Sequence, residues 1–233
     1  MYFFGDLDPK VSWVCRQLLR RGDNALDIGA NLGLVSLTMR ALVGPEGTVH
    51  AFEPQAELAD LLEQSSRANG FDDLHVHRVA LGLADSSLEL FVPDDNRGAA
   101  SLTRRSDAPG KLYEVPVRNT SDYLESLKLG PIRLVKMDVE GHEDLVARGG
   151  QRFFETNRPH AFIFELNGDR VAFEEQPIVR FMRELDYELY SLPKALARVR
   201  LRKMEPGMTD PGNDIVAVAR GRTYREVLAT LGE

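Results

Sequence analysis

The sequence predicts an α/β fold: a doubly wound, mostly parallel sheet of seven strands, with helices on both faces and a small β-hairpin insertion. Short apolar runs recur along the chain, as buried parallel strands require. Between them lie segments whose apolar residues recur at helical spacing. Alternation of strand and helix is typical of a doubly wound sheet. Because no repeat or linker divides the 233 residues, we expect one domain over residues 1–233.

The N-terminal segment 1–21 is predicted to contain a helix. Asp8 is a favourable N-cap and Pro9 suits the first helical position, and apolar residues follow at helical spacing as far as Arg21-Gly22. The aromatic run 2–4 precedes this helix and is unusually apolar. We consider it a candidate to fold over a bound cofactor or to pack against a second subunit of a homodimer.

The remaining elements follow in alternation. A buried strand runs from Asn24 into a glycine-containing turn, and a helix starts from that turn at Leu34. The other strands expected in the main sheet span residues 48–53, 74–81, 132–138, 161–166, 187–192 and 214–219. Further helices are expected around residues 58–62, 124–127, 145–146 and 178–185.

Residues 88–117 form the predicted insertion. Its two strands, 88–92 and 113–117, are expected to pair as a hairpin outside the main sheet. Between them, the segment 93–111 is polar and rich in Gly, Asp, Arg and Ser. Because a loop of this length in a compact domain is usually functional or disordered, we consider it a candidate substrate lid.

The turn after the first strand carries the first functional signal. Gly29 and Gly33 permit a sharp turn and a close ligand approach, and the amides at the helix start favour an anionic group. A dinucleotide-binding turn would read Gly-x-Gly-x-x-Gly, but Asn31 stands at the middle glycine and hinders a pyrophosphate. Asp27 would also repel a pyrophosphate, whereas it would attract the ammonium of a methionine moiety. The turn therefore favours S-adenosylmethionine over a nicotinamide dinucleotide.

Carboxylates follow four of the apolar strands, at Asp27, Glu53, Asp138 and Glu165. Ligands in open α/β sheets bind at the carboxyl ends of the strands, so these acids are expected along one edge. Glu53 is placed to accept hydrogen bonds from both ribose hydroxyls of a nucleoside. Four acids in such positions indicate a functional site more than solvated surface.

A hydroxyl acceptor of a methyl group must lose its proton, and two routes stay open. A general base can take the proton, for which Asp138, Glu140 and His142 are the candidates, imidazole having the most suitable ordinary pKa. Alternatively, Mg²⁺ held by Asp138, Glu165 and Asn167 can acidify a coordinated hydroxyl.

Composition indicates the compartment and the partners. With 29 Lys and Arg against 36 Asp and Glu, the net charge of −7 does not favour nonspecific binding to nucleic acid. The single cysteine, Cys15, excludes a disulfide within the chain and suits a reducing compartment. The apolar runs are too short to span a membrane, and no basic secretory signal is present. We expect a cytoplasmic protein that acts on a small molecule, without nucleic-acid or membrane partners.

Three blocks of sequence, 26–33, 51–54 and 135–143, together resemble the FkbM family of S-adenosylmethionine-dependent methyltransferases. The third block, Val-Lys-Met-Asp-Val-Glu-Gly-His-Glu, is the most specific. The resemblance implies a class I methyltransferase fold, which is Rossmann-like, and O-methylation of a hydroxyl on a sugar, polyketide or similar small metabolite. A nicotinamide-dependent oxidoreductase and a catalytically inactive S-adenosylmethionine-binding partner protein are the alternatives.

The same resemblance implies the roles of individual residues. Asp138 would stand beside the transferred methyl group and Glu53 would hold the ribose. The arginine at position 78 departs from the small polar residue frequent in the family, which affects the adenine contacts. The implied cofactor-binding residues are Asp27, Gly29, Ala30, Asn31, Gly33, Glu53, Pro54, Val79, Ala80 and Asp138.

Overall fold

The computed structural model describes residues 9–93, 110–166, 173–192, 201–205, 208, 212–221 and 223–232. The aromatic run 2–4, nearly all of the candidate lid 93–111 and the predicted metal ligand Asn167 lie outside these residues.

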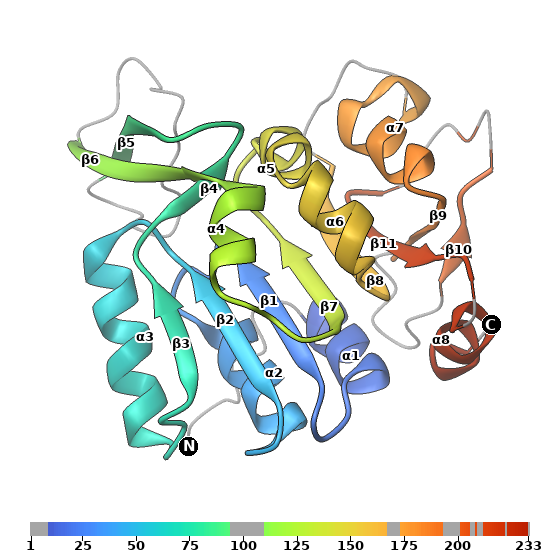
Figure 1. Ribbon diagram of the computed structural model, residues 1–233, viewed down its shortest axis with the longest axis horizontal. Helices are drawn as coiled ribbons and strands as arrows, with labels where there is room; N and C mark the ends of the chain where they lie inside the picture. The colour runs from blue at the N-terminus through green and yellow to red at the C-terminus, as the bar shows by residue number, and fades with distance from the viewer. Residues whose placement is uncertain are drawn as a thin grey trace.

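An eight-stranded sheet forms the centre of the molecule, with the strand order β10-β9-β11-β8-β7-β1-β2-β3 (Figure 1). Neighbouring strands from β3 to β8 pair in parallel, whereas β11 pairs antiparallel with both β8 and β9. The expectation of a mostly parallel sheet is confirmed, and a two-residue strand adds an eighth to the seven expected. The strands are β1 (Asn24–Ile28), β2 (Thr48–Phe52), β3 (Leu74–His77), β7 (Ile132–Met137), β8 (Ala161–Glu165), β9 (Tyr187–Ser191), β10 (Arg202–Lys203) and β11 (Asp214–Ala219).

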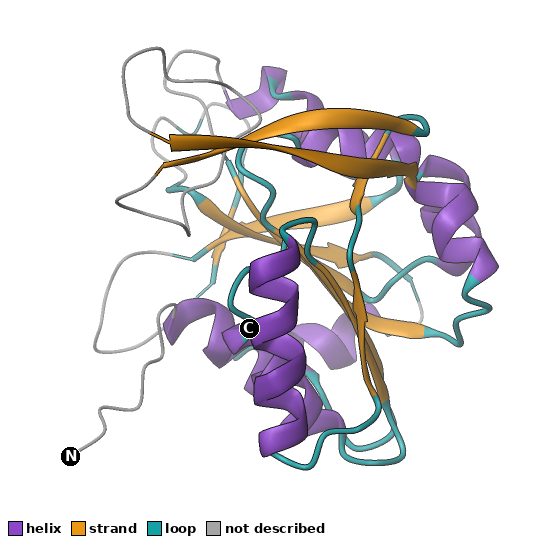
Figure 2. Ribbon diagram, turned by 90° about the vertical axis from the view of Figure 1, so that its left-hand side faces the viewer, coloured by secondary structure: helices purple, strands orange, loops and turns teal. Residues whose placement is uncertain are grey.

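Helices cover both faces of this sheet (Figures 1 and 2). Alternate strand residues enter different cores: Leu26 and Ile28 pack with α4, α5, α6 and α7, whereas Ala25 packs with α1, α2 and α8. Both faces are therefore buried, which explains the continuous apolar strands. No helix in the described part of the chain is long and apolar enough to cross a membrane. The helices are α1 (Pro9–Leu18), α2 (Leu34–Val43), α3 (Ala56–Ala68), α4 (Thr120–Ser126), α5 (Glu143–Gly149), α6 (Gln151–Asn157), α7 (Pro177–Glu184) and α8 (Tyr224–Thr230), with a 3₁₀ turn η1 (Phe173–Glu175).

A second, three-stranded sheet lies beyond the carboxyl ends of β1, β2 and β3 (Figure 1). The predicted hairpin is present as β5 (Ser86–Pro93) and β6 (Gly110–Asn119), which pair antiparallel. The strand expected over 74–81 is wrong in its extent, because the chain leaves the central sheet after His77 and forms β4 (Ala80–Gly82) along β6. Two short strands in different sheets thus replace one long strand.

Two helices, α6 and α8, were not expected from the sequence. The signal for α6 was hidden by two glycines. Gly149 and Gly150 indicate a helix end, and α5 does end there, but α6 begins at the next residue. The site of Gly150 has no room for a side chain, because a Cβ there would lie 2.3 Å from the ring of Phe154. The second glycine therefore permits the close packing of α6 and is not part of a loop.

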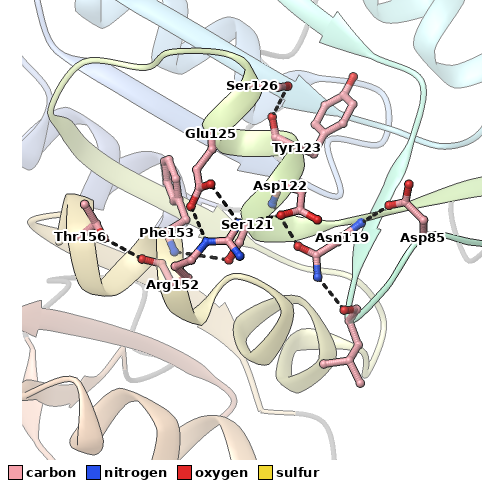
Figure 3. A network of polar contacts seen from close by, with 11 residues as sticks. Asp85, Asn119, Ser121, Asp122, Tyr123, Glu125, Ser126, Arg152, Phe153 and Thr156 are labelled. Carbon is pink, nitrogen blue, oxygen red and sulfur yellow. Dashed lines mark hydrogen bonds and ion pairs between the residues drawn. The ribbon is translucent and has the colours of Figure 1, made fainter.

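A polar network fixes α4 against α6 (Figure 3). The guanidinium of Arg152 donates hydrogen bonds to the carboxylates of Asp122 and Glu125. The side chain of Asn119 accepts a hydrogen bond of 3.0 Å from the Asp122 amide, which caps α4, and donates one of 2.6 Å to the Leu83 carbonyl. These contacts fix α4 to α6 and, through Asn119, to the end of β4.

Candidate functional site

A cleft of about 750 Å³ opens at the carboxyl ends of β1, β2 and β7. Its volume is in the range of small-molecule sites, and it lies where open α/β sheets bind ligands. Residues from the second sheet, including Leu81 and Leu90, form part of its wall. The cleft contains most of the residues that the sequence singled out, namely Gly29, Ala30, Asn31, Gly33, Glu53, Pro54, Val79, Ala80, Asp138, Glu140 and His142.

The turn from 29 to 33 is held by hydrogen bonds within the protein. The amides of Gly29 and Ala30 both donate to the Phe52 carbonyl at 3.0 Å, and the amide of Gly33 donates to the Ala30 carbonyl at 2.8 Å. The amide of Asn31 donates to Oε2 of Glu53 at 2.8 Å. The amides of Gly29, Ala30, Asn31 and Gly33 therefore have partners within the protein. The expectation of an anionic group concerns the amides at the start of α2, from Leu34 on, and stays a prediction.

Both glycines of the turn are required by the packing of the protein itself. Gly29 has a φ of +78°, and a Cβ at this position would lie 1.9 Å from the carbonyl oxygen of Asp138. Gly33 has a φ of +81°, and its Cβ would lie 2.0 Å from a methyl carbon of Leu62. The space that these glycines leave open is therefore filled by neighbouring protein atoms and not by a ligand.

Asp27 lies beneath the cleft and not on its wall. Its side chain is fully buried, with 0% exposure. Ser36 on α2 donates a hydrogen bond of 2.5 Å to Oδ2, and Nζ of Lys136 lies 3.2 Å from Oδ1. The parallel register places Asp27 directly opposite Lys136, so the two side chains share one face of the sheet. The expectation that Asp27 directly contacts the amino group of a ligand is therefore corrected.

Lys136 was not among the residues that we selected from the sequence. It is 6% exposed, lines the cleft, and donates a hydrogen bond of 2.7 Å to the Gly29 carbonyl. Its Nζ also lies 3.7 Å from Oδ2 of Asp138. Burial alone would lower the pKa of this ammonium, but Asp27, Asp138 and Glu53 raise it above its ordinary value. A lysine within the apolar run of β7 was the available signal, since buried lysines are almost always paired.

Glu53 joins the turn to the end of β2. Besides the bond from Asn31, its Oε1 accepts a hydrogen bond of 2.8 Å from the Gln55 amide. The residue is 4% exposed, and burial raises the pKa of its carboxyl, although the two amides and Lys136 act in the opposite direction. Each oxygen keeps a lone pair, so the carboxylate can still accept from a ligand hydroxyl.

The loop from 138 to 143 forms the rim opposite Glu53. The buried carboxylate of Glu143 accepts hydrogen bonds from the amides of Val139 at 3.0 Å and Gly141 at 3.3 Å. These bonds support a tight turn in which Glu140 and Gly141 have φ values of +53° and +91°. The third sequence block, 135–143, therefore determines the shape of this loop, because the Glu143 carboxylate accepts hydrogen bonds from two of the loop's backbone amides.

The side chains presented by this loop are polar. Asp138 is 46% exposed, and Glu140 is also exposed. Burial, followed by the charges of Asp138, Glu165 and Glu143, raises the pKa of Glu140 above its ordinary value. The Nδ1 atom of His142 is buried without a hydrogen-bond partner in the described structure. The rim thus offers carboxylate and imidazole groups that can accept a proton or a hydrogen bond.

The residues expected to hold Mg²⁺ do not form a described metal centre. Glu165 is not among the described residues of the cleft wall, and Asn167 lies outside the described residues. Within the described part of the chain, no group of three or more His, Cys, Asp or Glu side chains is arranged to hold a metal ion. The structure therefore gives the Mg²⁺ hypothesis no support.

Three histidines lie together outside the cleft, on β2 and β3. The ring of His50 stacks on His75 and His77 at centroid distances of 4.6 and 5.2 Å. Nδ1 of His50 lies 2.9 Å from Nε2 of His77, and Nδ1 of His77 lies 3.2 Å from the Tyr123 hydroxyl. Burial, followed by the neighbouring histidines, lowers the pKa of His50 to about 3 and that of His77 to about 4. The three rings form a stacked cluster at the edge of the sheet, in which His50 and His77 are neutral at pH 7.

Comparison with known proteins gives one family and several similar folds. A family model, the methyltransferase FkbM domain, matches residues 27–189. A protein-L-isoaspartate O-methyltransferase from Methanocella arvoryzae is 33% identical over 105 residues, which cover 45% of this chain and 53% of that relative. The chain thus matches about half the length of this curated relative.

Two solved structures share the fold. A methyltransferase FkbM from Methylobacillus flagellatus is 14% identical with a TM-score of 0.50, over 87% of this chain and 48% of that one. A protein from Streptococcus mutans, solved in complex with S-adenosylhomocysteine, is 10% identical with a TM-score of 0.51, over 93% of this chain and 98% of that one.

Proposed function

The chain belongs to the FkbM family of methyltransferases, whose fold is that of S-adenosylmethionine-dependent enzymes, and on this premise we propose that it methylates a hydroxyl oxygen of a small metabolite. The supporting observation is that Glu53, Asp138 and the turn from 29 to 33 converge on one cleft of about 750 Å³. Family membership also sets aside the nicotinamide-dependent oxidoreductase.

The residues of the cleft fit S-adenosylmethionine. Glu53 would hold the ribose hydroxyls, while Val79 and Ala80 would flank the adenine. Gly29, Ala30, Asn31 and Gly33, with Pro54, would line the remaining wall. Carboxylates at Glu53, Asp138 and Glu140 give the cleft a negative character that suits a cationic ligand. Asp27 would support this site from below, through Ser36 and Lys136.

S-adenosylmethionine supplies a methyl group on a positively charged sulfur, which an acceptor oxygen can displace in line. The protein's contribution begins with position, because the turn and the loop 138–143 are both fixed by internal hydrogen bonds. As the oxygen–carbon bond forms, the carbon–sulfur bond breaks and its electron pair stays on sulfur. The proton of the acceptor hydroxyl then passes to the rim, where Asp138, Glu140 and His142 are the candidate bases.

The carboxylates of the rim favour an acceptor that carries a neutral hydroxyl over an acceptor that is an anion. A hydroxyl can donate a hydrogen bond to Asp138 or Glu140, whereas a carboxylate or phosphate would meet like charges. The described lining residues include one lysine and no arginine, and that lysine is buried and paired. An isoaspartyl carboxylate, the acceptor implied by the Methanocella relative's name, is the less favoured alternative.

Binding and turnover test different parts of the proposal. Calorimetric titration with S-adenosylmethionine, S-adenosylhomocysteine and NAD should show binding of the first two only. Incubation with methyl-labelled S-adenosylmethionine and panels of sugars, polyketide-like alcohols, isoaspartyl peptides and ribosomal RNA should label an alcohol. Mass spectrometry before and after mild base separates a stable ether from a labile ester. Labelling of the peptide or RNA alone would contradict the small-hydroxyl proposal, and binding without labelling of any acceptor would favour the inactive partner protein.

A further inference from the structure

Lys136 stands between two carboxylates at the floor of the cleft. Nζ lies 3.2 Å from Oδ1 of the buried Asp27 and 3.7 Å from Oδ2 of the half-exposed Asp138. The bond of 2.7 Å to the Gly29 carbonyl fixes the ammonium under the turn. Among the described residues that line the cleft, Lys136 is the only lysine or arginine. The charge of this floor is therefore set by one cation within a group of anions.

The two carboxylates near Lys136 differ in what they can do. Asp27 is enclosed between Ser36 and Lys136, so its charge is matched within the protein. Asp138 lies beyond hydrogen-bond distance of the ammonium and has a side chain 46% exposed, so it can face a ligand. Without Lys136, the charge of Asp138 would act uncompensated on any cation in the cleft, as would that of Asp27 at a pH high enough to keep this buried carboxylate ionised. With it, the net negative charge is reduced.

This balance matters for a ligand that loses its charge during the reaction. The sulfur of S-adenosylmethionine is cationic, whereas that of S-adenosylhomocysteine is neutral. A strongly negative cleft floor would stabilise the sulfonium of S-adenosylmethionine before the reaction. This stabilisation is lost as the sulfur becomes neutral, so the barrier to methyl transfer would rise. The ammonium of Lys136 reduces the negative charge of the floor, so less stabilisation is lost during the reaction. It also brings the affinities for S-adenosylmethionine and S-adenosylhomocysteine closer together.

We infer that Lys136, held in place by Asp27, is a positioning residue whose charge offsets the cleft carboxylates and sets the relative affinity for S-adenosylmethionine and S-adenosylhomocysteine. The inference rests on the proposed cofactor site. Of the three candidate bases, only Asp138 lies near the ammonium of Lys136, at 3.7 Å and beyond hydrogen-bond distance. No described hydrogen bond joins Lys136 to Glu53, Glu140 or His142.

The test is the ratio of the dissociation constants, Kd for S-adenosylmethionine divided by Kd for S-adenosylhomocysteine, measured by calorimetry. Both ligands share the adenosine and amino acid parts, so a structural disturbance alters both constants together, whereas a change of charge alters mainly the first. Lys136→Met should lower the ratio roughly tenfold, as expected for a unit charge about 10 Å away at an effective dielectric constant of about 20. Lys136→Arg, which keeps the charge, should leave the ratio within about twofold of the wild type.

Lys136→Met leaves the buried Asp27 without its cation, and the variant can therefore fail to fold. A second variant is measured for this reason. Asp27→Asn leaves the ammonium less compensated, so the ratio should rise, in the opposite direction. The double variant Asp27→Asn/Lys136→Met should return the ratio towards the wild-type value. Circular dichroism and thermal unfolding establish which variants are folded.

The outcomes separate this inference from the proposed function. If the wild type binds neither ligand, the proposed cofactor site itself fails. If the wild type binds both and the ratio in a folded Lys136→Met or Asp27→Asn variant stays within twofold, the role of Lys136 is overturned while the cofactor site stands.

Discussion

The backbone amide of Asn31 donates a hydrogen bond of 2.8 Å to the carboxylate of Glu53, which ties the turn after β1 to the end of β2. The other oxygen of Glu53 accepts from the Gln55 amide at the same distance. One side chain therefore shapes two segments of the cleft wall. A ligand hydroxyl that binds Glu53 would meet a carboxylate already oriented by the backbone.

Glu53→Gln should weaken both the fold and the cofactor site. A glutamine has one carbonyl oxygen, so it can satisfy only one of the two amides, and we expect a loss of about 1–2 kcal/mol in the free energy of unfolding. Binding of S-adenosylhomocysteine should weaken about tenfold or more, as measured by calorimetry alongside urea unfolding. Glu89→Gln is the matched control, because Glu89 is exposed on β5 away from the cleft wall and should change neither quantity. Equal effects of the two substitutions would contradict the role of Glu53.

Gly29→Ala should destabilise the protein more than a substitution at another glycine with positive φ. A methyl group at Gly29 would collide with the Asp138 carbonyl at 1.9 Å, in addition to the strain of a φ of +78°. Gly70 is the matched control, since its φ is +69° and a Cβ there meets nothing within 4 Å. We expect Gly70→Ala to cost about 1 kcal/mol and Gly29→Ala at least about 2 kcal/mol more, measured by urea unfolding. Similar costs at both positions would show that the contact with Asp138 is unimportant.

The sequence was sufficient for the parallel sheet and for the position of the cleft. Alternation of apolar strands with amphipathic helices is a local signal, and the residues of the turn 29–33 and the loop 138–143 lie at strand ends by topology alone. The residue at which the strand from Leu74 ends could not be predicted from such local signals. Its apolar pattern continues beyond His77, but β4 satisfies the same pattern by pairing with β6, which follows much later in the chain.

The role of Asp27 was not predictable for a related reason. An acid at a strand end can face a ligand or a neighbouring strand, and the sequence does not give the register between β1 and β7. That register places Asp27 opposite Lys136 and turns both side chains towards α2. The lysine in the apolar β7 was a visible anomaly, yet its partner could be identified only once the two strands were paired.

Stability should fall as the pH is lowered from about 7 to about 5, in part because of His50 and His77. Their folded-state pKa values of about 3 and about 4 lie below the ordinary value of 6.5, so the unfolded chain binds protons in this window and the folded protein does not. Each such group adds up to about 1.4 kcal/mol per pH unit to the slope, and the combined effect should be about 2–3 kcal/mol. Urea unfolding at several pH values measures the slope. His77→Gln should remove the contribution of His77, which is about half of these 2–3 kcal/mol. An unchanged slope in that variant would contradict the prediction.

Glu143 should matter more to the cleft than its neighbour on the same helical turn. Glu143→Ala removes the acceptor of the Val139 and Gly141 amides, which should lower the free energy of unfolding by about 2–3 kcal/mol. Because the loop also carries Asp138 and His142, S-adenosylhomocysteine binding should weaken severalfold. Asp144→Ala is the control: it removes a carboxylate from the same first turn of α5 and should cost only about 0.5 kcal/mol through the helix dipole. Binding of S-adenosylhomocysteine is measured by calorimetry and the free energy of unfolding by urea, on both variants. Equal effects of the two substitutions would mean that Glu143 acts only through its charge at the helix start, and would contradict its role as the acceptor of the loop amides.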